Sequence, residues 1–248
     1  MVKITFLGTA SAVPNQFHQN SHFIVESEKR TLLIDCVGNP VSRLDQAGID
    51  PIRIDDLILT HFHPDHVSGT PLLLMDLWLM GRKKPLDVFG MENVIVRIRQ
   101  MMDLYDWQTW EGFYPVNFVC LDDQDQNLFF DQDGLKIWSA PVCHMIPGIG
   151  LRMEFPEGNL VYSSDTGPCD QVVELAKGAD ILIHESTGEG HGHSSPAQAG
   201  QIAQKAKARA LYLIHYPPDC DLTAWIEQAQ ANFSGDVFAA EDLMSVEF

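Results

Sequence analysis

The sequence lacks the features of a secreted, disulfide-bonded or membrane-spanning protein. Its 248 residues include five cysteines, an odd number with no CxxC pair, so neither a disulfide framework nor a zinc knuckle is indicated, and we expect small buried thiols. The longest apolar run, at 71–81, is interrupted by Asp76 and is shorter than the roughly 20 residues that span a bilayer. The N-terminus, MVKITFLGTASAVPN, has too short an apolar stretch for a secretory signal. These absences predict a cytoplasmic protein without a membrane segment.

Basic residues are also scarce. The chain has 34 acidic and 16 basic residues, which gives a net charge of −18. A protein that binds nucleic acid normally presents clustered Lys and Arg residues. The only such clusters here are short and lie at 81–85, 96–100 and 204–209. Short clusters of this kind are typical of solvated helix faces and loop ends. The charge balance therefore favours a small-molecule substrate, and we do not expect a nucleic acid as a partner.

The chain is a mixture of predicted strands and helices with no internal boundary. No repeat, low-complexity tract or Pro/Gly/Ser linker divides it, so we predict one domain, residues 1–248. Strand-like runs lie at 3–8, 21–27, 30–36, 55–60, 86–90, 116–121, 135–140, 148–155, 159–165, 179–185 and 210–216. Helical patterns lie at 40–48, 68–80, 91–105, 170–177, 195–208 and 222–232. Helices that follow pairs of strands favour an α/β sandwich of two mixed sheets with helices on the outer faces.

The stretch THFHPDHVSG at 60–69 concentrates metal-ligating side chains. A predicted strand ends at His61, so this stretch lies in the loop that leaves the strand. His61 and His63 can clamp one ion, while Asp65 and His66 follow a turn and face a neighbouring position. Imidazole and carboxylate groups are ligands of zinc and similar divalent ions. A structural zinc site is usually closed by four Cys or His, so the mixed set predicts an open, catalytic metal site rather than a His-rich surface turn.

The motif HFHPDH resembles the HxHxDH signature of the metallo-β-lactamase superfamily. The HES element at 184–186 and the HSS element at 193–195 together resemble the ribonuclease Z branch of that superfamily. Further segments follow in the order seen in that branch: FLGTASAVP at 6–14, LIDCVGN at 33–39, PVCHMIPGIGLRM at 141–153, VYSSDTG at 161–167 and LIHYPP at 213–218. The resemblance covers nearly the whole chain. It implies the αββα sandwich of the superfamily and a metal-dependent hydrolase.

The resemblance also implies a centre of two metal ions. The ligands of one ion would be His61, His63 and His144, those of the other would be Asp65, His66 and His215, and Asp165 would bridge the two ions. The residues themselves agree with this assignment, because His144, Asp165 and His215 each follow a predicted strand and so meet at one edge of the sandwich. Taken alone, His144 or His215 would fit a core histidine equally well.

Two further residues match the branch: Glu185 in HEST and His193 in GHGHSSP. In ribonuclease Z-like enzymes this pair is thought to relay a proton to the leaving group, a task that suits a tunable histidine oriented by a carboxylate. His191 lies in the same glycine-rich stretch but is not followed by Ser-Ser. The remaining histidines, His18, His22 and His184, have no counterpart in the motifs and are interpreted as structural.

The expected chemistry is attack of a metal-bound hydroxide on a phosphodiester. A water held between two divalent ions loses its proton near neutral pH and is placed for in-line attack. Asp65 can accept a proton from that water, His193 can protonate the departing alkoxide, and Glu185 can hold the histidine ring. The ligand set contains no Cys, which argues against a β-lactamase-type site. Nitrogen and oxygen ligands favour two zinc ions, with manganese or iron as alternatives.

The sequence departs from the ribonuclease Z pattern in one respect that bears on the substrate. A tRNA-processing ribonuclease Z carries a protruding arm between the third-motif histidine and the bridging aspartate, whereas here only residues 145–164 separate His144 from Asp165. A strand pair with PEGN as its turn accounts for most of that interval. The missing arm and the negative charge favour a small phosphodiester, such as a cyclic nucleotide, over tRNA.

Other functions stay open at this point. A tRNA 3′ endonuclease of the ribonuclease Z type is the main alternative, an ester, lactone or thioester hydrolase is a second, and a non-catalytic metal-bound scaffold is a third. The proton relay argues against the scaffold. The aromatic-rich region 101–119 suits a lid over the site, the packing of a helix, or the interface of a homodimer.

Overall fold

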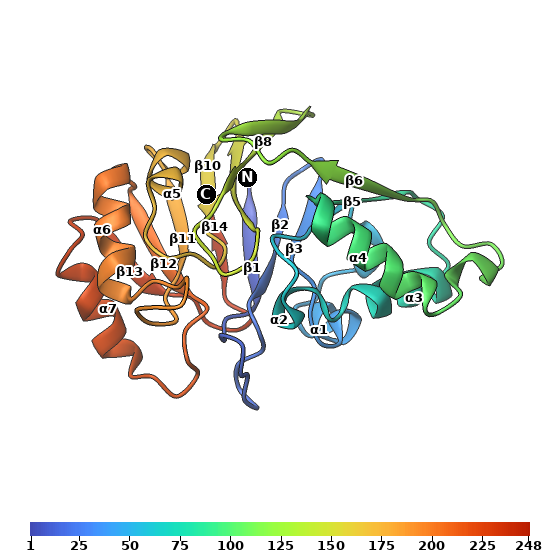
Figure 1. Cartoon of the computed structure of the whole chain (residues 1–248), viewed down its shortest axis with the longest axis horizontal. Coiled ribbons are helices and arrows are strands. Elements are labelled where there is room, and N and C mark those ends of the chain that lie inside the picture. Colours follow the sequence, from blue (N-terminus) through green and yellow to red (C-terminus); the bar gives the residue numbers. More distant parts are fainter.

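Two mixed β-sheets of seven strands each form the centre of the molecule (Figure 1). The computed structural model describes residues 1–248. In the first sheet the order is β14 (Ser245–Glu247), β1 (Lys3–Gly8), β2 (His22–Glu26), β3 (Thr31–Ile34), β4 (Asp56–Ile58), β5 (Leu86–Met91) and β6 (Val116–Leu121). This sheet pairs the first strand of the chain with the last, since Lys3 lies opposite Glu247 in the antiparallel pair β1–β14.

The second sheet is built from the later part of the chain. Its order is β13 (Asp236–Ala239), β12 (Ala210–Ile214), β11 (Ile181–Glu185), β10 (Gly158–Tyr162), β9 (Ile149–Phe155), β8 (Leu135–Pro141) and β7 (Asn127–Gln132). Strands β10 to β13 are parallel, whereas β7 to β10 are antiparallel. Parallel strands buried on both faces have nearly continuous apolar sequences, and all five residues of β11 are buried.

Helices cover the outer faces of the two sheets (Figure 1). The first sheet is accompanied by α1 (Pro40–Gln46), η1 (Pro51–Arg53), α2 (Pro64–Val67), α3 (Thr70–Leu79), α4 (Glu92–Asp103) and η2 (Trp107–Thr109). The second sheet is accompanied by α5 (Asp170–Leu175), α6 (Pro196–Ala206) and α7 (Leu222–Gln230). The helix α6 begins with a capping box in which Ser195 and Gln198 satisfy each other's backbone N–H groups, as the Ser-Pro start signal predicts.

The apolar core has two parts. The larger part contains buried side chains from both sheets together with α3 and α4, and the smaller part lies between the second sheet and α5, α6 and α7. In the smaller part Gly200 of α6 lies so close to α7 that a Cβ atom would meet the Ala229 carbonyl oxygen at 2.3 Å. This arrangement confirms the predicted αββα sandwich. The limits of the single domain, 1–248, stay a prediction.

The loops that follow several strands meet at one edge of the sandwich. After β4, His61 forms an isolated antiparallel bridge with Gly148, and the Ile149 N–H donates to the Thr60 carbonyl oxygen at 3.1 Å. These contacts tie the loop after β4 in the first sheet to the start of β9 in the second. The edge therefore collects residues from both sheets.

Most predicted elements are confirmed, with three differences. The strands β7, β13 and β14 have no counterpart among the predicted strand ranges. The predicted helix 68–80 begins only at Thr70, because Gly69 packs against the backbone of Val37 and separates α2 from α3. The expectation of buried thiols is wrong for four of the five cysteines, since only Cys36 is buried. No helix has the length and apolar character needed to cross a membrane.

The aromatic region at 101–119 packs against the molecule's own core. Trp107, Trp110 and Phe113 are partly buried against the larger core cluster, and Trp110 stacks on Trp78 of α3 at 5.2 Å. Tyr114 is 2% exposed. These contacts account for the aromatic residues by packing, which is the plainest of the interpretations that the sequence allows.

Candidate metal centre

Strained backbone turns place the polar side chains at the common edge. Asp35 after β3, Ser164 after β10 and His215 after β12 have φ values of 59°, 54° and 55°, in the left-handed region that non-glycine residues seldom adopt. Each lies just beyond the end of a buried strand. Such conformations persist only where the surrounding structure enforces them, and they cluster at functional sites.

A first group of donor atoms comes from three separate segments. It consists of His61, His63, His144 and Asp165, whose nearest nitrogen and oxygen atoms all lie within 4.8 Å of one another. The Nδ1 atom of His63 is 3.1 Å from Nε2 of His61 and 3.1 Å from Nε2 of His144. The sequence predicts these four residues at one metal position, and the structure brings them together.

A second group lies beside the first. Asp65, His66 and His215 also have donor atoms within 4.8 Å of one another. The Oδ2 atom of Asp165 is 3.4 Å from Nε2 of His66, 3.5 Å from Nε2 of His215 and 3.8 Å from Nε2 of His61. Asp165 is therefore the side chain that lies between the two groups, where the sequence predicts a bridging ligand.

Hydrogen bonds on the far side of the rings fix which nitrogen faces the centre. Thr60 donates its hydroxyl proton to Asp35, so it accepts from Nδ1–H of His61 at 3.1 Å. Thr187 donates to the carbonyl oxygen of His215 and accepts from Nδ1–H of the same residue at 2.7 Å. The lone pairs on Nε2 of His61 and His215 are thereby directed into the centre.

Two further rings, those of His66 and His144, are oriented in the same way. Nδ1–H of His66 donates to Asp35 Oδ2 at 2.8 Å, and Nδ1–H of His144 donates to the Gly192 carbonyl oxygen at 2.9 Å. Asp35 was not among the candidate site residues, although its position after the apolar run RTLLI is the same strand-end signal that marks Asp165. Thr60, Thr187 and Gly192 carry no comparable signal in the sequence.

The arrangement fits divalent cations. Nε2 of His66, Nε2 of His215 and Oδ1 of Asp165 are buried without a hydrogen-bond partner, which is costly unless another group satisfies them. Nε2 lone pairs of His61 and His144 also point at the same atom of His63. A cation bound by these nitrogen and oxygen atoms would remove the repulsion between the facing lone pairs. It would also give the unpaired atoms a partner. The donor set of the cluster therefore suits divalent metal ions.

The pKa shifts describe a cluster that compensates its own charges. Burial would raise the pKa of Asp165, but His215 and His66 hold it well below the ordinary value. Burial would lower the pKa of His66, but Asp165 and Asp35 raise it well above the ordinary value. Burial, together with His66, lowers the pKa of His61 well below the ordinary value. One proton on His66 thus balances part of the carboxylate charge when no cation does.

Glu185 and His193 form a separate pair at the rim of this centre. Nδ1–H of His193 donates to Glu185 Oε1 at 3.0 Å. The buried carboxylate also accepts backbone N–H bonds from Thr166, Thr187 and Ser194 at 3.2, 2.8 and 2.9 Å. Burial would lower the pKa of His193, but the hydrogen bond that it donates to Glu185 raises this pKa above the ordinary value. A ring nitrogen of His193 also lies within 4.8 Å of donor atoms of Asp165 and His215. The position of His193 is therefore also compatible with a role as a metal ligand.

The other histidines lie in different surroundings. His184 is buried and donates from Nδ1 to the Glu185 carbonyl oxygen, His22 donates to the Asn20 carbonyl oxygen, and His18 contacts Thr9. His191 is exposed. None of them belongs to a donor group at the centre.

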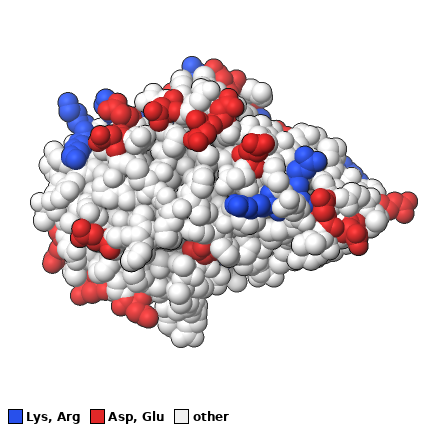
Figure 2. Space-filling view, viewed as in Figure 1, with Lys and Arg blue, Asp and Glu red and all other residues white.

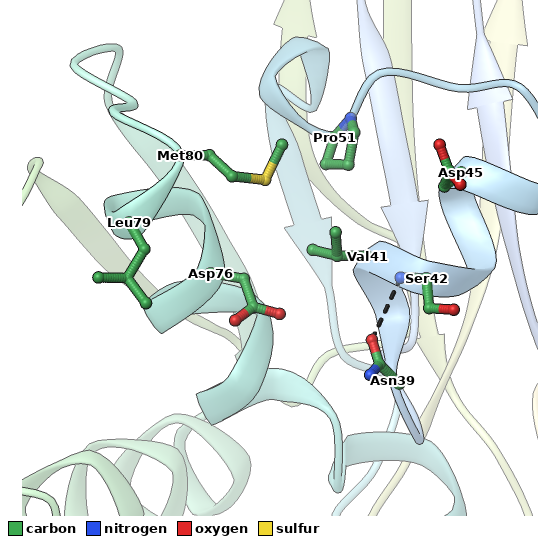
Figure 3. A pocket seen from close by; sticks show the side chains of 8 residues that line it. All are labelled: Asn39, Val41, Ser42, Asp45, Pro51, Asp76, Leu79 and Met80. Carbon is green, nitrogen blue, oxygen red and sulfur yellow. Dashed lines mark hydrogen bonds between the residues drawn. The ribbon is translucent and has the colours of Figure 1, made fainter.

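An open groove with a volume of about 580 Å³ lies elsewhere, between α1 and α3 (Figure 3). Asp76, Leu79 and Met80 on one side face Val41 and Ser42 on the other. No residue of either donor group lines it. The two donor groups therefore lie outside this groove.

A family model described as "Anti-Pycsar protein Apyc1" matches residues 2–236, nearly the whole chain. The chain belongs to the Anti-Pycsar protein Apyc1 family. The sequence motifs indicate the superfamily and its ribonuclease Z branch, and none of them distinguishes the Apyc1 family within it.

Curated relatives of this Apyc1 family member are named Ribonuclease Z. The protein of Methanothermobacter thermautotrophicus is 27% identical over 304 aligned positions, which include the whole of this chain and 97% of the relative. The protein of Mycobacterium marinum is 26% identical over 277 positions, covering the whole chain and 99% of the relative. Because both alignments are longer than the 248 residues of this chain, the relatives contain segments that it lacks.

Solved structures share the fold of this Apyc1 family member. The metallo-β-lactamase fold protein YhfI from Bacillus subtilis superposes with a TM-score of 0.86 at 22% identity, over the whole chain and 99% of YhfI. The short form of human tRNase Z superposes with a TM-score of 0.82 at 26% identity, over 99% of this chain and 98% of the human one. These findings confirm the metallo-β-lactamase fold and the ribonuclease Z-like resemblance. Together with the donor cluster they identify a metal-dependent hydrolase.

Proposed function

We propose that this chain is a dinuclear metal-dependent phosphodiesterase acting on a small phosphodiester, such as a cyclic nucleotide. The observation that carries the proposal is the convergence of two donor groups on Asp165 beside the His193–Glu185 pair. Two adjacent cation positions suit a substrate whose attacking and leaving oxygens both need stabilisation. A histidine held by a carboxylate at the rim suits a leaving group that needs a proton.

The proposal assigns each donor group to one ion. His61, His63 and His144 hold the first ion, Asp65, His66 and His215 hold the second, and Asp165 binds both. We expect zinc at both positions, with manganese or iron as alternatives for the same nitrogen and oxygen donors. When bound, such ions supply an activated water and offset the negative charge of a phosphodiester.

The protein's own residues position these donors and move the protons. Asp35 orients His66, Thr60 orients His61 and Thr187 orients His215, so that the ligand rings need not rearrange when an ion binds. Asp65 accepts a proton from the attacking water in this scheme.

His193 gives a proton to the departing oxygen. Its Nδ1 is engaged by Glu185, which leaves Nε2 as the atom that faces the substrate. Glu185 is fixed by three backbone N–H groups as well as by His193, so it holds the ring in one orientation. The pair therefore acts as a positioned general acid.

The size and charge of the chain favour a small substrate. The interval between His144 and Asp165 is occupied by the antiparallel hairpin β9–β10, with Gly158 opposite Phe155, and contains no protruding arm. Acidic side chains are spread over the face shown in Figure 2, while Lys and Arg lie in small separate groups, one of them over α4. A net charge of −18 opposes the binding of a long polyanion.

A ribonuclease Z-type tRNA 3′ endonuclease is the second candidate. The names of the relatives support this alternative better than they support a small substrate, and they weaken the expectation that nucleic acid is not a partner. Both candidates use the same ions and the same general acid. They differ only in how the substrate is held.

A direct comparison of substrates tests the order of the two candidates. The metal-loaded chain is assayed for kcat/KM on a cyclic nucleotide, on bis-nitrophenyl phosphate and on precursor tRNA at one salt concentration. We expect the small diesters to be cleaved and precursor tRNA to be cleaved poorly, with Asp165→Ala inactive on all three. Efficient tRNA 3′ cleavage with no turnover of the small diesters would reverse the order, and no turnover of any of them would refute a phosphodiesterase.

A further inference from the structure

Two free cysteines lie in neighbouring loops that carry candidate metal ligands. Cys143 immediately precedes His144, and Cys169 follows Asp165 by four residues, at the start of α5. The backbone of Cys143 pairs with Gly167 in an isolated antiparallel bridge, in which the Gly167 N–H donates to the Cys143 carbonyl oxygen at 2.8 Å. The two thiols thus belong to loops that are already hydrogen-bonded together.

Thr166 connects the two cysteines at the level of the side chains. Its Oγ1 atom is 3.2 Å from the backbone nitrogen of Cys143 and 3.6 Å from Sγ of Cys169. Thr166 thus contacts both cysteines, while the Cys143–Gly167 bridge holds the two loops together. Neither thiol is sealed in the core, because Cys143 is exposed and Cys169 is partly exposed. The pair is therefore both preassembled and accessible to a reagent.

We propose that Cys143 and Cys169 are a redox-active pair that closes to a reversible disulfide and thereby joins the loop carrying His144 to the segment that follows Asp165. Disulfide bonds require Cα atoms within about 7 Å and side chains that point toward each other, conditions that the backbone bridge and the shared contacts with Thr166 favour. The other three cysteines give no such arrangement, since Cys36 is buried in the core and Cys120 and Cys220 lie on β6 and after β12.

The reaction needs an oxidant, for which a small disulfide such as oxidised glutathione suffices. The more exposed Cys143 attacks one sulfur of glutathione disulfide, forming a mixed disulfide and releasing one glutathione, which takes up the Cys143 proton. Cys169 then attacks the Cys143 sulfur, forming the protein disulfide and releasing the second glutathione, which takes up the Cys169 proton. Two protein thiols are oxidised, and one glutathione disulfide is reduced to two thiols.

Closure of the disulfide should alter the affinity of the metal centre. The two sulfur atoms must come together to a bond of about 2.05 Å, which shifts the backbone next to His144. That residue is held on its other side by the Gly192 carbonyl oxygen. Disturbing a ligand's support commonly costs about 10-fold to 100-fold in metal affinity, so we expect a loss of about 10-fold in the oxidised form. This consequence rests on the proposed role of His144 as a ligand, whereas the disulfide itself does not.

Peptide mapping tests the disulfide. The full chain is treated with glutathione disulfide, quenched with iodoacetamide, digested without reduction and analysed by mass spectrometry. We expect one cross-linked peptide joining Cys143 to Cys169, retained in the control Cys120→Ser. In Cys169→Ser we expect glutathione to remain trapped on Cys143, and in Cys143→Ser we expect no cross-link. A wild-type chain that accumulates stable glutathione adducts on Cys143, or that cross-links other cysteines, would refute the pair.

Metal retention tests the coupling separately. Reduced and oxidised chains loaded with zinc are titrated with a chelator, and the double variant Cys143→Ser/Cys169→Ser is carried through the same treatment. We expect the oxidised wild-type chain to release zinc at about 10-fold lower chelator concentration, with no change in the double variant. A cross-linked chain with unchanged zinc retention would refute the coupling and leave the disulfide. Absence of zinc from the reduced chain would instead refute the proposed metal centre.

Discussion

Asp165 is the residue on which the two donor groups depend, because its Oδ2 atom lies within 3.8 Å of imidazole nitrogens from both. We expect Asp165→Ala to lose both metal ions, whereas Asp65→Ala, the matched control from the second group alone, should lose one. Elemental analysis of each protein after gel filtration gives the metal content per chain. Retention of one ion by Asp165→Ala would contradict a bridging role.

His193 allows a test that separates a general acid from a ligand. We expect His193→Ala to keep both ions, while its rate on a diester with an alkoxide leaving group falls by about 10² to 10⁴, the range for loss of a positioned acid. On bis-nitrophenyl phosphate the loss should be small, because nitrophenolate leaves without a proton. Glu185→Gln should follow the same pattern more weakly. Equal losses on both substrates, or a missing ion, would show that His193 has another role.

His22 predicts an acid-sensitive component of stability. This residue is fully buried, and burial lowers its pKa from 6.5 to about 4 in the folded chain. Between pH 6.5 and 4 His22 binds a proton in the unfolded chain but not in the folded chain. The free energy of unfolding is therefore unaffected by protonation of His22 above pH 6.5 and falls as the pH drops toward 4. The loss amounts to about 3 kcal/mol below pH 4.

The variant His22→Asn isolates this effect. Its amide can still donate to the Asn20 carbonyl oxygen, but it does not titrate. Denaturant unfolding of metal-free wild type and variant, measured between pH 7 and 4, should show a shallower pH dependence in the variant. Parallel curves for the two proteins would mean that His22 does not contribute.

The candidate ligands are predictable from the sequence because each follows an apolar strand, and strand ends of one edge converge. The structure confirms that these donors meet, although their assignment to individual ions stays a prediction. Their orientation was not predictable. It depends on Thr60, Thr187 and the Gly192 carbonyl, which are far from their partners in the sequence or have no side chain that indicates the contact. It also depends on Asp35, whose carboxylate could equally be a metal ligand or a group that orients one.

At the scale of secondary structure, α6 and α7 are in contact at Gly200. A Cβ atom at this position would lie 2.3 Å from the Ala229 carbonyl oxygen, which is backbone and cannot rotate away. We expect Gly200→Ala to reduce the free energy of unfolding by about 1 to 3 kcal/mol, the usual cost of overpacking, despite the better helix propensity of Ala. Lys205→Ala, an exposed position on the same helix, is the control and should change little.

The differences between predicted and observed elements have local causes. Periodicity identifies the long helices, but it does not reveal that the backbone of Val37 excludes a side chain at Gly69, where the helix predicted at 68–80 has not yet begun. The strand β7 has the sequence NLFFDQ and follows the acidic stretch 122–125. Its three apolar residues are too few to predict a strand from the sequence. It becomes a strand by pairing with β8, which is a tertiary effect.

At the scale of the whole molecule, the charge of −18 should govern how anions approach. Charges interact over about 30 Å at 0.01 M salt and about 8 Å at 0.15 M. We therefore expect kcat/KM for an anionic diester to rise between these salt concentrations, because screening weakens repulsion. A neutral osmolyte at matched osmolality is the control and should have no effect. A fall in kcat/KM with added salt would indicate that a local positive field, rather than the net charge, guides the substrate.

The pairing of β1 with β14 has a consequence for biosynthesis. The strand β1 is synthesised long before one of its neighbours in the sheet, β14 (Ser245–Glu247). The donors likewise appear in stages, with His61 to His66 early and His215 late. A nascent chain therefore displays an incomplete set of ligands during most of its synthesis. The full set of donors therefore becomes available for metal insertion only after His215 has been made, and the first sheet is completed only after β14 has been made.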